Sequence, residues 1–181
     1  MIGLKFDIIP SNVNEKEKIE LFGKHFAEYW SREKAISVSH NNPDRLIVGA
    51  DTIVIAKGKI LGKPRNKEES IEMLKMLSGS VHRVITGVTI FCKREQIIKT
   101  FSETTKVSVL TIPDKKLTFY INNFNTLDKA GSYGIQDWFS VWIKKIDGCY
   151  YNVMGLPLSK FYFYYSKIMK DYFPKNNHEK I

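Results

Sequence analysis

The sequence predicts a single mixed α/β domain, and three observations support this prediction. Strand-like and helix-like segments alternate along the chain without long linkers or internal repeats. The length of 181 residues suits one domain that buries its own core. A hydrophobic content of 43% excludes a disordered chain, and no apolar run approaches the roughly 20 residues that cross a bilayer.

The first elements in the chain are a predicted strand and a predicted helix. Residues 2–10 alternate well enough for a strand that Pro10 ends. Asn14 and Glu17 form a capping-box pattern for a helix that ends near Val38. The apolar stripe of this helix repeats at steps of three to five residues and consists of Ile19, Phe22, Phe26, Trp30 and Ala35.

A central strand, a hairpin return and a short helix follow. Residues 46–56 form an apolar run suited to a buried strand, and Lys57-Gly58 marks a tight turn into residues 59–65. Asn66 begins a second capping-box pattern, and its amphipathic helix ends at Ser78-Gly79.

The second half of the chain continues the alternation of strands and helices. Two strand candidates precede a helix opened by Pro113, because proline suits a first helical turn. A glycine-punctuated segment then leads to another strand, and an aromatic-rich helix closes the chain near Phe173. The predicted strands are residues 81–92, 96–110 and 139–146, and the helix after Pro113 ends near Asn122.

One carboxylate lies in the middle of the apolar central strand. Burying an ionised acid is costly, so Asp51 must face a cation, a metal or a wet cleft. The hairpin return brings Lys63 and Arg65 to the same neighbourhood. An acid and a basic loop joined by one tight turn predict a site for a polyphosphate with its metal.

The charge and cysteine content favour a cytoplasmic protein. The net charge of +9 is compatible with nucleic acid, an anionic membrane surface or an anionic substrate, but it is diffuse and favours a solvated lysine surface. We therefore expect no nucleic-acid or membrane partner. Cys92 and Cys149 lack metal-like spacing and fit free thiols in a reducing compartment. The first ten residues resemble a strand rather than a signal peptide.

Six short motifs are spread over nearly the whole chain. They are Pro10-Ser-Asn-Val-Asn-Glu15, Arg32-Glu-Lys-Ala35, Gly49-Ala-Asp-Thr52, Gly62-Lys-Pro-Arg65, Leu127-Asp-Lys-Ala-Gly-Ser-Tyr-Gly-Ile-Gln136 and Val153-Met-Gly-Leu-Pro-Leu158. Any one of them alone would be weak, but their order and approximate spacing make coincidence improbable. Together they resemble the motifs of the Maf family of nucleoside-triphosphate pyrophosphatases.

The resemblance implies hydrolysis of a nucleoside triphosphate between its α and β phosphates. It implies Asp51 as proton acceptor, with Glu15 and Asp51 as the carboxylates for a divalent metal, Mg²⁺ or Mn²⁺. Lys63 and Glu15 are also expected to act in catalysis, and Lys34 to bind the phosphates. Without the resemblance, we would interpret Glu15 as an acid that stabilises the N-terminus of the next helix. Lys34 would be a surface lysine whose aliphatic chain extends past Trp30.

The family's substrate branches suggest which base is bound. Thr52 with Gln136 resembles the branch that acts on dTTP and UTP, because a glutamine amide offers one donor and one acceptor to thymine or uracil. Taken alone, Gln136 would read as a loop amide. Adjacent strand residues point to opposite faces, so we predict that the strand ends or bulges between Asp51 and Thr52.

The family also implies a fold and an oligomeric state. The expected fold is a strongly twisted mixed β-sheet flanked by helices, with a deep nucleotide cleft, and members are often homodimers. The run Phe161-Tyr-Phe-Tyr-Tyr165 fits core packing or a subunit interface better than a stacking platform for bases.

The beginning of the chain departs from the family pattern. Members begin with a strand and a Ser-x-Ser-Pro-Arg-Arg loop, whereas this sequence begins at Met1-Ile2-Gly3 beyond that loop. Either the start is misplaced or the loop is lost, and we expect a misplaced start. The alternative function is a catalytically impaired nucleotide-binding regulator linked to septum formation. An RNA-binding module would rest on charge and aromatic content alone.

Overall fold

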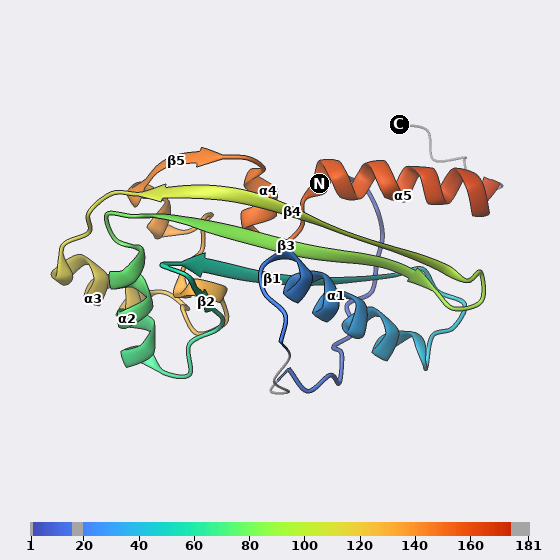
Figure 1. Cartoon of the computed structure of the whole chain (residues 1–181), viewed down its shortest axis with the longest axis horizontal. Helices are drawn as coiled ribbons and strands as arrows, with labels where there is room; N and C mark the ends of the chain where they lie inside the picture. The colour runs from blue at the N-terminus through green and yellow to red at the C-terminus, as the bar shows by residue number, and fades with distance from the viewer. Residues whose placement is uncertain (1, 16–19, 175–181) are drawn as a thin grey trace.

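The computed structural model describes residues 2–15 and 20–174, and its centre is a five-stranded sheet. The strand order is β2-β1-β3-β4-β5, and every pairing within the described residues is antiparallel, where we expected mixed strand directions. The β3–β4 hairpin runs the length of the molecule (Figure 1). The strands are β1 (Ile47–Ala56), β2 (Lys59–Leu61), β3 (Val81–Cys92), β4 (Ile97–Val109) and β5 (Ile143–Asp147).

Five α-helices surround this sheet within the described residues. The alternation predicted from the sequence is confirmed, and most boundaries agree to within a few residues. The helices are α1 (Lys24–Ser39), α2 (Lys67–Leu77), α3 (Asp114–Asn123), α4 (Tyr150–Val153) and α5 (Leu158–Tyr172).

Turn and cap chemistry explains why the central predictions hold. Lys57 and Gly58 both adopt positive φ, 47° and 75°, as a two-residue type I′ hairpin requires. The side chain of Asn66 accepts a hydrogen bond from the backbone N–H of Glu69 and so caps α2. The carboxylate of Glu69 accepts in turn from the backbone N–H of Arg65.

Two predictions for the N-terminal segment are wrong. Residues 2–10 form no strand, because none of the five strands of the sheet pairs with them. An ion pair between Asp7 and Arg45 ties this segment to the domain. The first helix begins at Lys24 rather than near Asn14, and Glu17 of the predicted capping box lies outside the described residues.

A third difference concerns the strand predicted at residues 139–146. Residues 138–142 form a short 3-10 helix, η2, and β5 begins only at Ile143. The carboxylate of Asp137 accepts from the N–H of Phe139 and from the hydroxyl of Tyr120, which holds this turn. Trp138 stacks on Tyr120, with ring centroids 5.9 Å apart. Aromatic packing thus overrides the strand pattern.

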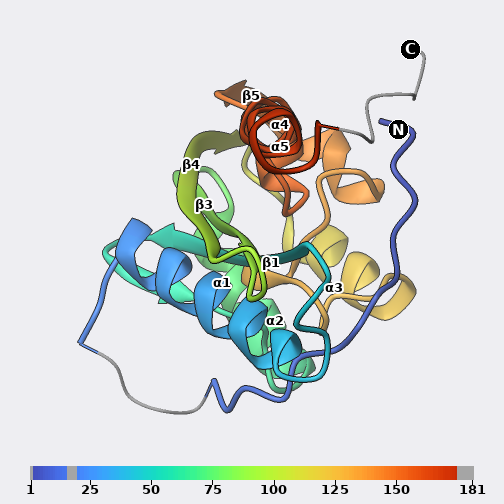
Figure 2. The ribbon, with the colours of Figure 1, turned by 90° about the vertical axis from the view of Figure 1, so that its right-hand side faces the viewer.

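The two faces of the sheet are covered by different helices. Helix α1 packs on one face, and α5 lies on the opposite side of β3 and β4 (Figure 2). Helix α2 shares the face of α5 and packs on β1 through a core that contains Val54 and Leu74. The odd-numbered residues of β1 face α1, and the even-numbered residues face the other layer.

Candidate active site

Helix α1 approaches the sheet closely enough to place its side chains directly over β1. A Cβ atom on Gly49 would collide with the backbone oxygen of Ser31, and one on Gly87 would collide with the backbone of Ala27. Only glycine therefore permits this contact. The consequence is that Lys34, one turn further along α1, lies over Asp51 on the same face.

Lys34 joins two carboxylates. Its Nζ atom donates to Oδ1 of Asp51 at 2.7 Å and lies 3.0 Å from Oε1 of Glu15. The side chain of Asp51 is only 9% exposed, that of Lys34 20% and that of Glu15 53%, so the cluster opens to solvent on the side of Glu15. The structure therefore brings together three of the predicted site residues from three separate segments.

The cluster shifts the pKa of both buried members. Burial raises the pKa of Asp51, and the charge of Glu15 adds to this, while Lys34 and Lys63 oppose it. Burial alone would lower the pKa of Lys34, but its bonds to Asp51 and Glu15 outweigh burial and raise it. A carboxylate with a raised pKa is suited to accept a proton near neutral pH.

Lys63 completes the positive side of the cluster. It lies in the exposed turn after β2, and its charge lowers the pKa of Asp51, which places it within electrostatic reach. The tight β1–β2 turn thus carries a cation toward the side of the buried acid. Arg65, two residues on, pairs instead with Glu69 across 3.1 Å.

The predicted irregularity between Asp51 and Thr52 is wrong. Strand β1 pairs with β3 without a break over residues 47–55, with Asp51 opposite Gly87 and Thr52 opposite Thr86. The regular pleat sends the Thr52 side chain to the face opposite Asp51. The Thr52 hydroxyl lies 2.9 Å from that of Thr86.

Gln136 lies in an exposed turn between the 3-10 helices η1 (Ala130–Ser132) and η2. Among the described residues, no hydrogen bond or ion pair joins its side chain to Asp51. Its neighbour Ile135 is buried in the core under the same face as Thr52, and Gly131 contacts Val54 on that face. Thr52 and the segment that carries Gln136 therefore lie on one side of the sheet, and Asp51, Lys34 and Glu15 lie on the other.

Sequence reasoning missed Thr86, whose hydroxyl lies 2.9 Å from that of Thr52, and Asn152, whose backbone carbonyl accepts a hydrogen bond from Thr86. Thr86 is an ordinary strand residue by pattern, and Asn152 directly precedes the motif at residues 153–158, outside every motif used. Only the register of β1 on β3 reveals the pairing of Thr86 with Thr52.

The carboxylates can be tested as ligands for a metal. The described residues hold no group of three or more His, Cys, Asp or Glu side chains arranged for a metal ion. Mg²⁺ often takes one or two carboxylates and completes its shell with water and substrate phosphates. Glu15 and Asp51 both contact one cation, the Lys34 ammonium group, so this pair fits such a shared site.

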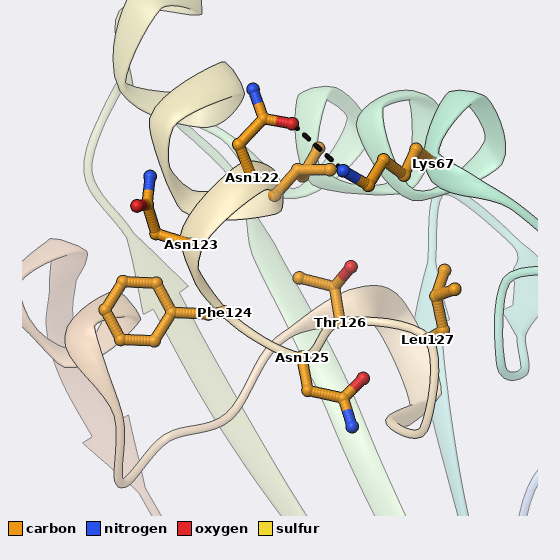
Figure 3. Close-up of a pocket in the computed structure, with 8 residues that line it drawn as sticks. Lys67, Asn122, Asn123, Phe124, Asn125, Thr126 and Leu127 are labelled. Carbon is orange, nitrogen blue, oxygen red and sulfur yellow. Dashed lines mark hydrogen bonds between the residues drawn. The ribbon is translucent and has the colours of Figure 1, made fainter.

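Two open pockets lie elsewhere in the molecule. One, of about 330 Å³, follows α3, and Lys67 donates to Asn122 at 3.1 Å on its wall (Figure 3). The other, of about 670 Å³, lies between β4 and the start of α5 and is lined in part by Glu103, Lys160 and Phe163. None of the predicted site residues lines either pocket, and neither is the deep cleft that we expected.

A buried acid with a raised pKa, flanked by two lysines and a second carboxylate, is suited to chemistry on a phosphate group. Comparison with known proteins identifies the family. The sequence profile described as Maf-like protein matches residues 1–168. The chain therefore belongs to the Maf family.

Three relatives of this chain are named dTTP/UTP pyrophosphatase. The protein of Clostridium tetani is 42% identical over 163 residues, which cover 87% of this chain and 84% of the relative. The protein of Carboxydothermus hydrogenoformans is 43% identical over 158 residues, with the same two coverages. That of Thermosipho africanus is 45% identical over 160 residues, covering 88% of this chain and 81% of the relative.

Proposed function

We propose that this protein is a nucleoside-triphosphate pyrophosphatase that hydrolyses dTTP and UTP to the monophosphate and pyrophosphate. One observation carries the proposal: the buried Asp51, its pKa raised, is held by Lys34 beside a second carboxylate. Relatives named for this activity, at 42–45% identity, support it.

The proposed reaction needs a base and positive charge, and the cluster supplies both. Asp51 accepts a proton from a water molecule, whose oxygen forms a bond to phosphorus. The anhydride bond between the α and β phosphates breaks, and pyrophosphate leaves. Lys34 and Lys63 stabilise the phosphate charge, which strengthens in a partly desolvated site.

A divalent cation, Mg²⁺ or Mn²⁺, would be held by Glu15 and Asp51 together with substrate phosphates. When bound, it would neutralise charge on the phosphates and polarise the phosphorus–oxygen bonds. The Lys34 ammonium group, which contacts both carboxylates, would then turn toward the phosphates. The convergence of two carboxylates on one cation supports this assignment.

Strand β1 has an open edge, across which one nucleotide can contact both faces of the sheet. Strand β2 pairs only with residues 54–56 of β1, so residues 47–53 have no described strand on that side. A nucleotide lying across this edge would reach Asp51 on one face with its phosphates. Its base would reach Thr52, and the segment that carries Gln136, on the other.

We also propose a cytoplasmic homodimer. Within the described residues, no helix has both the length and the apolar character needed to cross a membrane. Helix α5 buries Phe161 in the core but leaves Phe163 65% exposed and Tyr162 42% exposed. These two aromatic side chains supply apolar surface for a second copy.

The test is to incubate the chain with dTTP, UTP, CTP or GTP and Mg²⁺ or Mn²⁺ and to separate the products. Monophosphate with pyrophosphate is expected from dTTP and UTP. Release of diphosphate with inorganic phosphate would overturn cleavage between the α and β phosphates. A preference for GTP would overturn the role proposed for Gln136.

A further inference from the structure

A chain of hydrogen bonds begins at Thr52 and runs into the protein. The Thr52 hydroxyl lies 2.9 Å from the Thr86 hydroxyl, which donates to the backbone carbonyl of Asn152 at 2.9 Å. The same carbonyl accepts from the N–H of Gly155 at 3.1 Å. Thr86 and Asn152 are completely buried, whereas Thr52 is partly exposed.

The positions of the hydrogen atoms in this chain follow from counting donors. A carbonyl has no hydrogen, so the hydrogen between Thr86 and Asn152 belongs to Thr86. A threonine hydroxyl has one hydrogen, so Thr86 has none left for Thr52. The hydrogen between the two hydroxyl groups therefore belongs to Thr52. Its oxygen presents only lone pairs to anything that approaches from outside.

The inner end of the chain is fixed in place. The side-chain amide of Asn152 donates to the carbonyl of Val84 at 3.1 Å and to the hydroxyl of Thr105 at 3.0 Å. The Thr105 hydroxyl donates to the carbonyl of Cys149 and accepts from its N–H. These bonds tie α4 to β3 and β4, so the Asn152 carbonyl cannot turn away from Thr86.

We propose that Thr86 is a positioning residue for base selection, because it holds the Thr52 hydroxyl as a hydrogen-bond acceptor. This inference rests on the proposed function. An obligate acceptor favours a base with an N–H at that point, such as the N3–H of uracil or thymine. Cytosine presents an unprotonated N3, and two facing acceptors repel each other. Thr86 thus contributes to the preference for UTP over CTP without touching the nucleotide.

The test compares the kcat/KM values for UTP and CTP in three variants. Thr86→Val removes the hydroxyl at nearly constant shape and frees the Thr52 hydrogen, so the UTP-to-CTP ratio should fall at least tenfold. Thr86→Ser keeps the hydroxyl and should keep the ratio within threefold. The matched control is Thr89→Val, because Thr89 is equally buried on β3 and bonds to Ser31 and Thr100. It should lower the thermal stability and leave the ratio unchanged.

A second measurement does not depend on the folding of a variant. The wild-type chain should discriminate against N3-methyluridine triphosphate, which lacks the N3–H, by at least tenfold relative to UTP. The proposal is overturned if the UTP-to-CTP ratio of kcat/KM in Thr86→Val stays within threefold of the wild-type ratio. It is also overturned if the wild type hydrolyses N3-methyluridine triphosphate as well as UTP.

Binding separates this inference from the proposed function. If the chain hydrolyses no nucleotide, the proposed function is refuted. The comparison of UTP with CTP is then made from their dissociation constants, measured by calorimetry for the wild type and the variants. Tighter binding of UTP that weakens selectively in Thr86→Val would support the role of Thr86. Equal or absent binding of both nucleotides would overturn it.

Discussion

The Nζ atom of Lys34 lies 2.7 Å from Oδ1 of Asp51 and joins helix α1 to the central strand at a carboxylate that is 9% exposed. An ionised acid at this depth is tolerable because a cation contacts it. The same lysine also contacts Glu15. Lys34 therefore bridges two carboxylates, a buried one on the central strand and an exposed one in the N-terminal segment.

We expect Asp51→Asn to lower kcat by about 10²- to 10⁴-fold, the range for loss of a general base. The amide cannot accept a proton from water, but it keeps the shape of the carboxylate, so nucleotide binding should persist. Steady-state kinetics with calorimetric binding would check both. Asp114→Asn, at an exposed residue paired with Lys75, is the matched control. An undiminished rate in Asp51→Asn would show that another group is the base.

The raised pKa of Asp51 should appear in the acidic limb of the pH–rate profile. The rate should fall as the pH drops through this pKa, at a midpoint above the usual value of about 4 for an aspartic acid. Lys34→Met should move the midpoint higher still, because Lys34 lowers the pKa of Asp51. A midpoint that stays fixed in this variant would argue that the limb reports a different group.

Asp51 and Lys34 also link folding stability to pH. The pKa of Asp51 is raised in the folded state, so its stabilising contribution is present below the unfolded pKa and is lost as the pH rises through the folded value. The pKa of Lys34 is also raised, so its contribution to folding stability is likewise lost as the pH rises, in the alkaline range. Asp51→Asn should remove the loss of folding stability that comes from Asp51. Denaturant unfolding between pH 4 and 8, measured against the wild type, checks the expected flattening.

Metal removal should abolish turnover, and Glu15→Gln should raise the Mg²⁺ concentration for half-maximal rate by about tenfold. The reason is that one of two carboxylate ligands loses its charge. Activity titrated with Mg²⁺ after chelation measures the shift. Glu72→Gln, at an exposed position on α2, is the control and should leave the titration unchanged. Full activity of the wild type in excess chelator would count against any metal.

Gly87→Ala should destabilise the fold by about 1–3 kcal/mol, the usual cost of overpacking. The new methyl group would meet the backbone of α1 at Ala27, which cannot move aside as a side chain can. Because α1 carries Lys34, activity should fall as well. Gly62→Ala is the control, since no atom lies within 4 Å of its added Cβ. Chemical denaturation of both variants measures the difference.

Much of the fold was predictable because its signals are local. The hairpin at Lys57-Gly58 and the Asn66 cap depend on a few neighbouring residues, and both are confirmed. The strand predicted at residues 2–10 failed because a strand needs a partner edge, which no local pattern reveals. The early start predicted for β5 failed because Trp138 packs on Tyr120 instead.

By itself, the sequence determined that Asp51 is a buried acid in need of a cation, and motifs in order determined the family. Only the tertiary structure decided which cation contacts it and on which face each partner lies. Lys34 reaches Asp51 because two glycines let α1 approach the sheet, and Thr52 meets Thr86 because of strand register. Both depend on contacts between residues far apart in the chain, which composition and spacing do not encode.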